Sequence, residues 1–150
     1  VDLVIEAFNK NGKQLHVIGT GRDEERLKSI AHQNILFLGR VDDLVLCNEY
    51  SSAKAYIFPQ EEDFGLMPLE ANATGTPVIA YAKGGSLETI IQNKTGVFFD
   101  QQTPEAIIEA VKQFEEKTFS SEDLFEQAQR FSKEQFKARV LQLLAKEGLV

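Results

Sequence analysis

The chain has 150 residues, of which 43% are hydrophobic and 26% are charged, as is ordinary for a globular protein. This length allows a single domain with its own hydrophobic core. A balance of 16 basic and 23 acidic residues gives a net charge of −7, which disfavours a nucleic-acid-binding surface. The single cysteine, Cys47, excludes an intrachain disulfide and a multi-cysteine metal site.

The sequence contains no apolar run close to the roughly 20 residues that span a bilayer, and no signal-peptide pattern. Together with the low cysteine content, this favours a cytoplasmic location. The chain opens inside a helical pattern, at residues 1–8, with no strand before it. We therefore expect a fragment of a longer protein that lacks its first strand.

Segments with helical spacing alternate with short apolar runs along the whole chain. We expect helices at residues 1–8, 23–31, 42–52, 66–74, 86–92, 104–116, 122–131 and 133–145, and strands at residues 14–19, 34–38, 55–58, 77–81 and 96–99. This order predicts an α/β domain with a doubly wound, Rossmann-like parallel sheet, helices on both faces and a helical C-terminal tail. In such sheets ligands bind outside the carboxyl ends of the strands.

Several side chains are expected to be structural. The second helix should bury Leu27, Ile30 and Ala31, and Cys47 should be a small buried residue. The phenylalanines of the last helices are expected to belong to the core rather than to a stacking platform. His16 and His32 have no carboxylate or cysteine at metal-ligand spacing, which favours structural or solvent-facing roles.

An acidic loop, Glu61 to Asp63, leads into the predicted helix that begins near Leu66. The first N–H groups of a helix have no intrahelical partner, and the helix dipole favours an anion such as a diphosphate there. The carboxylates of Glu62 and Glu70 can accept hydrogen bonds from sugar hydroxyls. The alternative is that Glu62 and Asp63 cap the helix and Glu70 lies on a solvated face. Residue chemistry alone leaves both readings open.

Seven residues separate Glu62 from Glu70 within the block Pro59 to Ala80, which reads PQEEDFGLMPLEANATGTPVIA. This block resembles the signature of the retaining GT-B glycosyltransferases called family 4, or glycosyltransferases group 1. Other segments resemble the family in order and spacing: residues 1–8, 17–21, 37–41, 84–88 and 94–96. The resemblance therefore covers most of the chain.

The resemblance implies a role for each matching residue. Glu62 would be the catalytic carboxylate that binds the donor sugar, and Glu70 would bind the nucleotide ribose. The remaining residues expected at the substrate are Asp63, Phe64, Gly65 and Leu66 beside the sugar and phosphates, Gly19 and Gly21 in the donor cleft, Arg40 and Val41 against the base, and Gly84 and Gly85 in a nearby loop.

The resemblance also implies an activity, which is retaining transfer of a hexose from a nucleoside diphosphate sugar to a hydroxyl of a glycan or a lipid-linked acceptor. The segments 61–65 and 82–89 resemble those of mannosyltransferases that use GDP-mannose, which suggests polysaccharide biosynthesis. No metal or other cofactor is implied. Residues 1–150 would form the donor-binding domain, and the acceptor would bind to an N-terminal domain outside this chain.

The family's diphosphate-binding Arg and Lys precede its first helix, so they fall outside the sequence, and the isolated fragment is expected to be inactive. The resemblance leaves room for peripheral attachment of the parent protein to the inner face of a membrane. Three alternatives keep a similar fold: a non-catalytic nucleotide-sugar-binding module, a GT-B-fold epimerase or phosphorylase, and a receiver domain. A phosphorylase would need a cofactor-bearing lysine, and a receiver domain would need acidic residues after the strand that ends at Gly19. Neither pattern is found.

Overall fold

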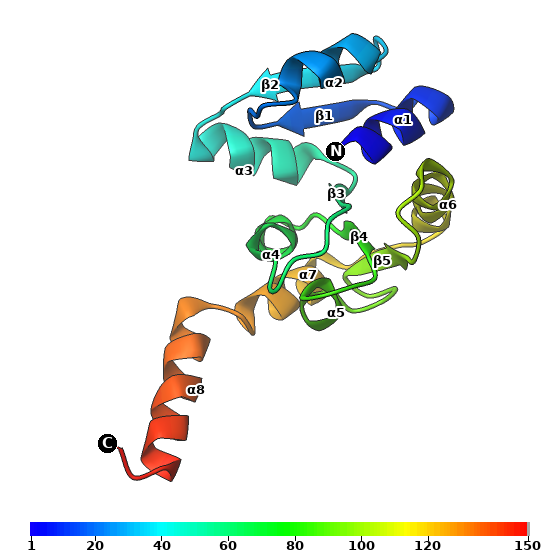
Figure 1. Cartoon of the computed structure of the whole chain (residues 1–150). Helices are drawn as coiled ribbons and strands as arrows, with labels where there is room; N and C mark the ends of the chain where they lie inside the picture. Colours follow the sequence, from blue (N-terminus) through cyan, green and yellow to red (C-terminus); the bar gives the residue numbers. More distant parts are fainter. Residues whose placement is uncertain (150) are drawn as a thin grey trace.

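The computed structural model describes residues 1–149 of the chain (Figure 1), with helices and strands that alternate from α1 to β5 and end in three helices. The elements are α1 (Asp2–Asn11), β1 (Leu15–Ile18), α2 (Glu24–Ile30), β2 (Ile35–Gly39), α3 (Asp43–Ser52), β3 (Tyr56–Phe58), α4 (Leu66–Ala73), β4 (Val78–Tyr81), α5 (Ser86–Thr89), β5 (Gly96–Phe99), α6 (Pro104–Glu115), α7 (Ser121–Gln129) and α8 (Lys133–Lys146). Every helix and strand expected from the sequence is present, which confirms the predicted α/β fold.

All strand pairs are parallel, but the strands form two sheets rather than the single sheet that the sequence suggested. β1 pairs with β2, and β3, β4 and β5 pair in that order. In residues 1–149, no strand joins the edge of β1 to the edge of β3. The division arises because strands share a sheet only when a neighbour lies within hydrogen-bonding distance.

β4 is buried at all four positions because helices cover both faces of its sheet. Ile79 and Tyr81 join a core cluster with α1, β5 and α6, in which Ile5 and Ile107 are fully buried. The alternate residues of β4 point into a second cluster around Phe58. This period of two is the geometry of a strand with two covered faces, and it fixes the carboxyl end of β4 beside the loop that follows β3.

The helices begin and end where local chemistry favours it. Asp42, Thr103 and Ser132 accept hydrogen bonds from backbone N–H groups at the starts of α3, α6 and α8. Gly12 ends α1 in the left-handed conformation, with φ of 71°. In residues 1–149, no helix combines the length and apolar character needed to cross a membrane.

Three predictions about burial are wrong wholly or in part, although Phe114 of α6 packs against the core as expected. α8 projects away from the rest of the molecule (Figure 1) and has no buried residue, so Phe136 is 69% exposed; Phe125 of α7 is 52% exposed. α2 has no fully buried residue: Ile30 is exposed, whereas Leu27 and Ala31 are partly buried and pack against the core. Cys47 is exposed on α3. Along α8 and at Ile30 the helical period predicts an apolar face, but no layer of the described chain covers these positions.

Candidate functional site

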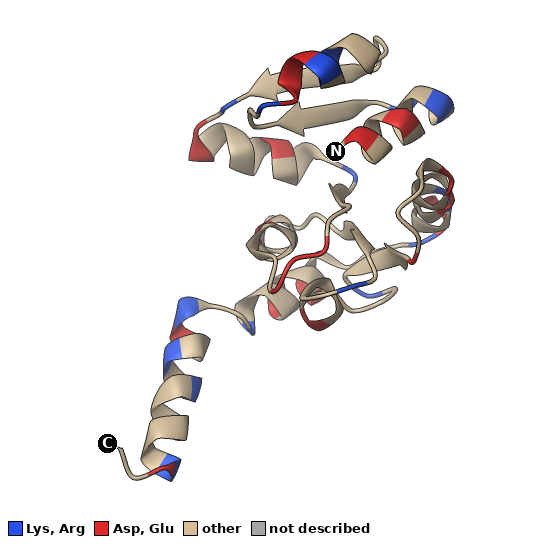
Figure 2. Cartoon of the chain, viewed as in Figure 1, with Lys and Arg blue, Asp and Glu red and all other residues tan. Residues whose placement is uncertain are grey.

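The site expected from the sequence lies at the carboxyl edge of β3 and β4. The acidic loop (residues 59–65) leaves β3 and enters α4, and its acidic residues, 61–63, are contiguous and coloured red in Figure 2. The loop after β4 carries Lys83, Gly84 and Gly85 and leads into α5. Parallel strands bring such loops together because all their carboxyl ends lie at one edge.

Gly65 fixes the end of the acidic loop. It has φ of 79°, which disfavours a side chain, and an added Cβ would lie 3.1 Å from Cζ of Phe58. Phe58 is fully buried at the end of β3, and Pro59 follows it. The loop therefore folds back over the strand from which it leaves, and only glycine fits comfortably at that bend.

Gly84 and Gly85 pack directly against the backbone of the acidic loop. The Gly85 N–H donates to the carbonyl oxygen of Glu62 at 2.7 Å. A Cβ on Gly84 would lie 2.3 Å from that same oxygen, and a Cβ on Gly85 would lie 2.3 Å from the carbonyl oxygen of Phe64. The two glycines thus hold the loop that carries Glu62, a role that the sequence did not reveal.

The two carboxylates of the Glu62–Glu70 pair have different surroundings. Glu62 is half-buried and accepts a hydrogen bond from Nε2 of Gln60 at 2.5 Å, whereas Glu70 is exposed on α4. Burial raises the pKa of Tyr56, and the charges of Tyr50, Glu62 and Glu70 raise it further. One tyrosine therefore lies close enough to both carboxylates to respond to their charges.

The side chain of Tyr56 makes two further contacts. Its hydroxyl donates to Sδ of Met67 at 3.4 Å, and its ring meets that of Tyr50 edge-on at 5.4 Å between centroids. Burial, followed by the charge of Glu70, raises the pKa of Tyr50 to about 12. Both tyrosines are therefore uncharged at neutral pH, and they pack in the same core cluster as Phe58, at the end of β3.

The start of α4 has no side-chain cap. Gly65 occupies the N-cap position, so Glu62 and Asp63 do not cap the helix, and the capping part of that alternative is wrong; its other part, that Glu70 lies on a solvated face, agrees with the exposure of Glu70. The first N–H groups of α4 are consequently not occupied by a capping side chain. Beside them Phe64 is 41% exposed and Leu66 is 63% exposed. The geometry can accommodate an anion at the helix start and hydroxyl groups at the carboxylates.

The other residues expected at the substrate form a second group. The Gly19 N–H donates to the carbonyl oxygen of Gly39 at 2.7 Å, which brings the β1 loop (residues 19–23) beside the turn that carries Arg40 and Val41. Gly19, Gly21 and Arg22 line a cleft of about 560 Å³ next to the start of α1. In residues 1–149, no hydrogen bond or ion pair joins this group to the acidic loop.

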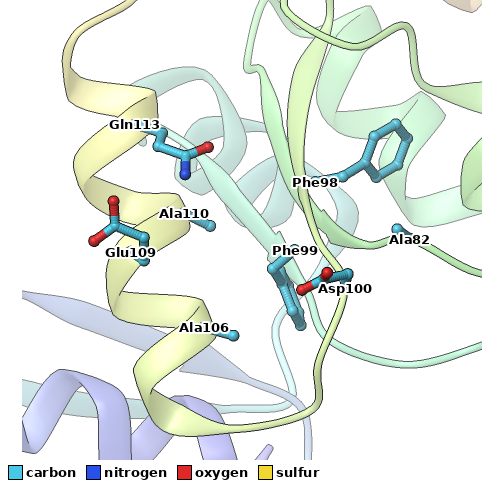
Figure 3. A pocket seen from close by; sticks show the side chains of 8 residues that line it. All are labelled: Ala82, Phe98, Phe99, Asp100, Ala106, Glu109, Ala110 and Gln113. Atoms are coloured by element: carbon cyan, nitrogen blue, oxygen red, sulfur yellow. The ribbon is translucent and has the colours of Figure 1, made fainter.

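Two other features lie apart from these loops. A cavity of about 340 Å³ between β5 and α6 (Figure 3) shares no lining residue with the predicted site. Nδ1 of His16 lies 2.7 Å from Oε2 of Glu49, a pairing between β1 and α3 that the sequence spacing did not suggest. Among residues 1–149, no group of three or more His, Cys, Asp or Glu side chains has the arrangement of a metal site.

Solved structures with similar folds include a sucrose-phosphate synthase and a glycosyltransferase. A sucrose-phosphate synthase from Thermosynechococcus elongatus superposes with a TM-score of 0.78 and 26% identity, over 97% of this chain and 42% of that one. A glycosyltransferase from Rickettsia africae superposes with a TM-score of 0.82 and 21% identity, over 96% of this chain and 43% of that one. The fold is thus shared with GT-B glycosyltransferases.

Sequence relatives agree with the structural ones. An uncharacterized glycosyltransferase of Methanocaldococcus jannaschii is 31% identical over 106 residues, covering 67% of this chain and 27% of the relative. A GDP-mannose-dependent alpha-(1-6)-phosphatidylinositol monomannoside mannosyltransferase of Mycobacterium tuberculosis is 32% identical over 114 residues, covering 67% of this chain and 30% of the relative. The chain therefore spans less than a third of the length of these relatives.

The family described as glycosyl transferases group 1 matches residues 1–138, which include both loops and both carboxylates. The match agrees with the sequence relatives and with the observed fold. This chain belongs to the group 1 glycosyltransferases.

Proposed function

We propose that the protein transfers a hexose, with retention of anomeric configuration, from a nucleoside diphosphate sugar to a hydroxyl of a glycan or lipid-linked acceptor. The observation that carries this proposal is the arrangement around α4. Glu62 lies in the loop before a helix start that no side chain caps, Glu70 lies on that helix, and both charges act on the half-buried Tyr56. Carboxylates that accept hydrogen bonds from hydroxyl groups, placed around an anion site, match a nucleotide sugar, in which a diphosphate joins two hydroxyl-bearing sugars.

In this proposal Glu62 binds the donor-sugar hydroxyls and Glu70 binds the ribose. The backbone N–H groups around Phe64, Gly65 and Leu66 face the diphosphate, and the helix dipole stabilises the charge that develops as the diphosphate leaves. Asp63 adds a further acceptor beside the sugar. The protein's contribution is then positioning and electrostatic stabilisation, with no metal or other cofactor.

The second group of residues completes the donor cleft. Gly19 and Gly21 are exposed, and no atom lies within 4 Å of a Cβ added to either, so the backbone there can be approached closely. Arg40 and Val41, on the adjoining turn, would lie against the base. Gly84 and Gly85 contribute by holding the acidic loop, which is how their packing supports a place near the substrate.

We further propose that residues 1–150 form the donor-binding domain of a larger enzyme, whose acceptor domain lies outside this chain. The edges of β1 and β3 are free of other strands in residues 1–149. One additional parallel strand between them would give the order β2-β1-new-β3-β4-β5, which is the doubly wound order of dinucleotide-binding sheets. The open edges therefore support a missing strand rather than two independent sheets.

GDP-mannose is the donor that we propose, because three of the relatives are named as GDP-mannose-dependent mannosyltransferases. Their names also specify phosphatidylinositol monomannosides, which supports a lipid-linked acceptor. We propose that a cytoplasmic enzyme meets this acceptor at the inner face of a membrane. Polysaccharide or glycolipid synthesis would be the setting. Each of these assignments concerns the complete protein.

The test is a titration of the complete protein with GDP-mannose, UDP-glucose and ADP-glucose, followed by transfer of labelled sugar to lipid and glycan acceptors. We expect GDP-mannose to bind most tightly and the product to keep the α configuration of the donor, as read by NMR. Tight binding without transfer would instead indicate a non-catalytic nucleotide-sugar-binding module. Failure to bind any nucleotide sugar, or an inverted product, would contradict the proposal.

A further inference from the structure

Gln60 is the side chain that contacts the carboxylate of Glu62. Its Nε2 donates to Oε1 of Glu62 at 2.5 Å, and both residues are half-buried. The two residues are two positions apart in the loop just after β3. Because an ionised carboxylate only accepts hydrogen bonds, the amide nitrogen of Gln60 must be the atom that faces it.

The backbone on either side of Gln60 is held from two other loops. Nε2 of Gln102, in the turn before α6, donates to the carbonyl oxygen of Pro59 at 2.9 Å. The Gly85 N–H, in the loop after β4, donates to the carbonyl oxygen of Glu62 at 2.7 Å. Residues 59–62 are therefore fixed at both ends, and the donor group of Gln60 is already in place before any ligand binds.

Glu62 has no other side-chain hydrogen-bond donor or ion-pair partner in the described chain. Within residues 1–149, no ion pair involves Glu61, Glu62 or Asp63, and Gln60 is the only side chain that donates a hydrogen bond to them. Three adjacent negative charges repel one another, so an unrestrained Glu62 side chain would turn toward solvent. The hydrogen bond from Gln60 opposes that motion.

We propose that Gln60 is a positioning residue that holds Oε1 of Glu62 and leaves Oε2 free to accept hydrogen bonds from the donor sugar. This inference rests on the proposed function, in which Glu62 binds that sugar. A hydrogen bond to a charged group is strong enough that its loss should weaken sugar binding about tenfold or more. The nucleotide part of the donor does not touch Glu62 in this proposal, so its binding should not change.

The experiment measures the affinities of the complete protein for GDP-mannose and for GDP by calorimetry, with UDP-glucose and UDP in parallel. Gln60→Met keeps the length of the side chain but removes the N–H donor. We expect it to weaken GDP-mannose binding about tenfold and to change GDP binding by less than about twofold. Gln60→Glu places a like charge beside Glu62 and should weaken GDP-mannose binding further. Gln14→Met is the matched control, since Gln14 is exposed before β1.

A double-mutant cycle with Glu62→Gln separates the two levels of the proposal. We expect Gln60→Met to have almost no additional effect once Glu62 is changed. If Glu62→Gln weakens GDP-mannose binding but Gln60→Met does not, the role of Gln60 is overturned while the proposed function stands. An equal loss of GDP and GDP-mannose binding in Gln60→Met would also overturn it, by indicating a general structural effect. If Glu62→Gln leaves the binding of GDP-mannose and UDP-glucose unchanged, the place of Glu62 at the donor sugar, the part of the proposed function on which this inference rests, fails.

Discussion

The acidic loop and the β1 loop both leave the carboxyl end of a parallel strand, and both contain glycine, but the surroundings of their glycines differ. Around Gly65, Gly84 and Gly85, an added Cβ would lie between 2.3 and 3.1 Å from other atoms. Around Gly19 and Gly21, no atom lies within 4 Å of an added Cβ. Packing thus requires glycine in the acidic loop and in the loop after β4 that packs against it. The glycines of the β1 loop, in contrast, face open space.

This difference indicates what each loop contributes. The acidic loop is fixed before a ligand arrives, so its carboxylates and N–H groups can be pre-oriented, which reduces the cost of ordering them on binding. The β1 loop leaves backbone exposed beside a cleft of about 560 Å³. We infer that the acidic loop orients the sugar, while the β1 loop supplies space for the donor.

The largest effect on stability is expected for Phe58→Ala. The Phe58 side chain is fully buried beneath the acidic loop and contacts the bend at Gly65, so the substitution should lower the free energy of unfolding by about 3–5 kcal/mol. Phe37→Ala, at a half-buried position on β2, is the control on the other sheet and should cost less. Urea denaturation of both variants measures the difference. Equal losses of unfolding free energy would contradict the inference that the acidic loop is packed more tightly than the region around Phe37.

Gly85→Ala compares the two loops directly. Its Cβ would collide with the Phe64 backbone, so we expect a loss of about 1–3 kcal/mol in stability together with weaker GDP-mannose binding. Gly21→Ala places the same methyl group in open space and should change stability by less than about 0.5 kcal/mol. Similar losses for the two variants, measured by denaturation, would remove the distinction between the loops.

A smaller effect is expected at alkaline pH, where Tyr50 ionises. Burial and the charge of Glu70 raise its pKa from 10.0 to about 12 in the folded protein. The folded state therefore keeps the Tyr50 proton more tightly than the unfolded state does, and this stabilisation is present below pH 10 and is lost as the pH rises toward 12. Tyr50→Phe should reduce the loss of stability over that interval. An unchanged slope in denaturation experiments between pH 10 and 12 would contradict the role of Tyr50.

Much of the fold follows from local pattern. The strand expected at residues 96–99 is β5, and the helix expected at residues 42–52 differs from α3 by one residue at its start. Pattern did not predict which surfaces meet: Ile30 and Phe136 have the spacing of buried residues but are exposed because no layer covers them. The division into two sheets likewise depends on a neighbour for β1 and β3, which periodicity within each strand does not specify.

The same limit applies to the site. The residues of the acidic loop are contiguous, and a helix start after Gly65 could be predicted from them. The hydrogen bond between Gly85 and Glu62 spans 23 positions, and the one between Gln102 and Pro59 spans 43, so neither contact leaves a signal in local sequence. Gln60 is close to Glu62 in sequence, but the hydrogen bond that it donates to Glu62 depends on the orientation of its side chain, which the sequence does not specify.

The most direct test of the account is to compare Glu62→Gln and Glu70→Gln in the complete protein by calorimetric titration with GDP and GDP-mannose. We predict that Glu70→Gln weakens both ligands by about tenfold, since each contains the ribose. Glu62→Gln should weaken GDP-mannose alone, because GDP lacks the sugar that Glu62 is proposed to bind. Wild-type affinity of Glu70→Gln for GDP, or an equal effect of Glu62→Gln on both ligands, would contradict the assignment of the two carboxylates.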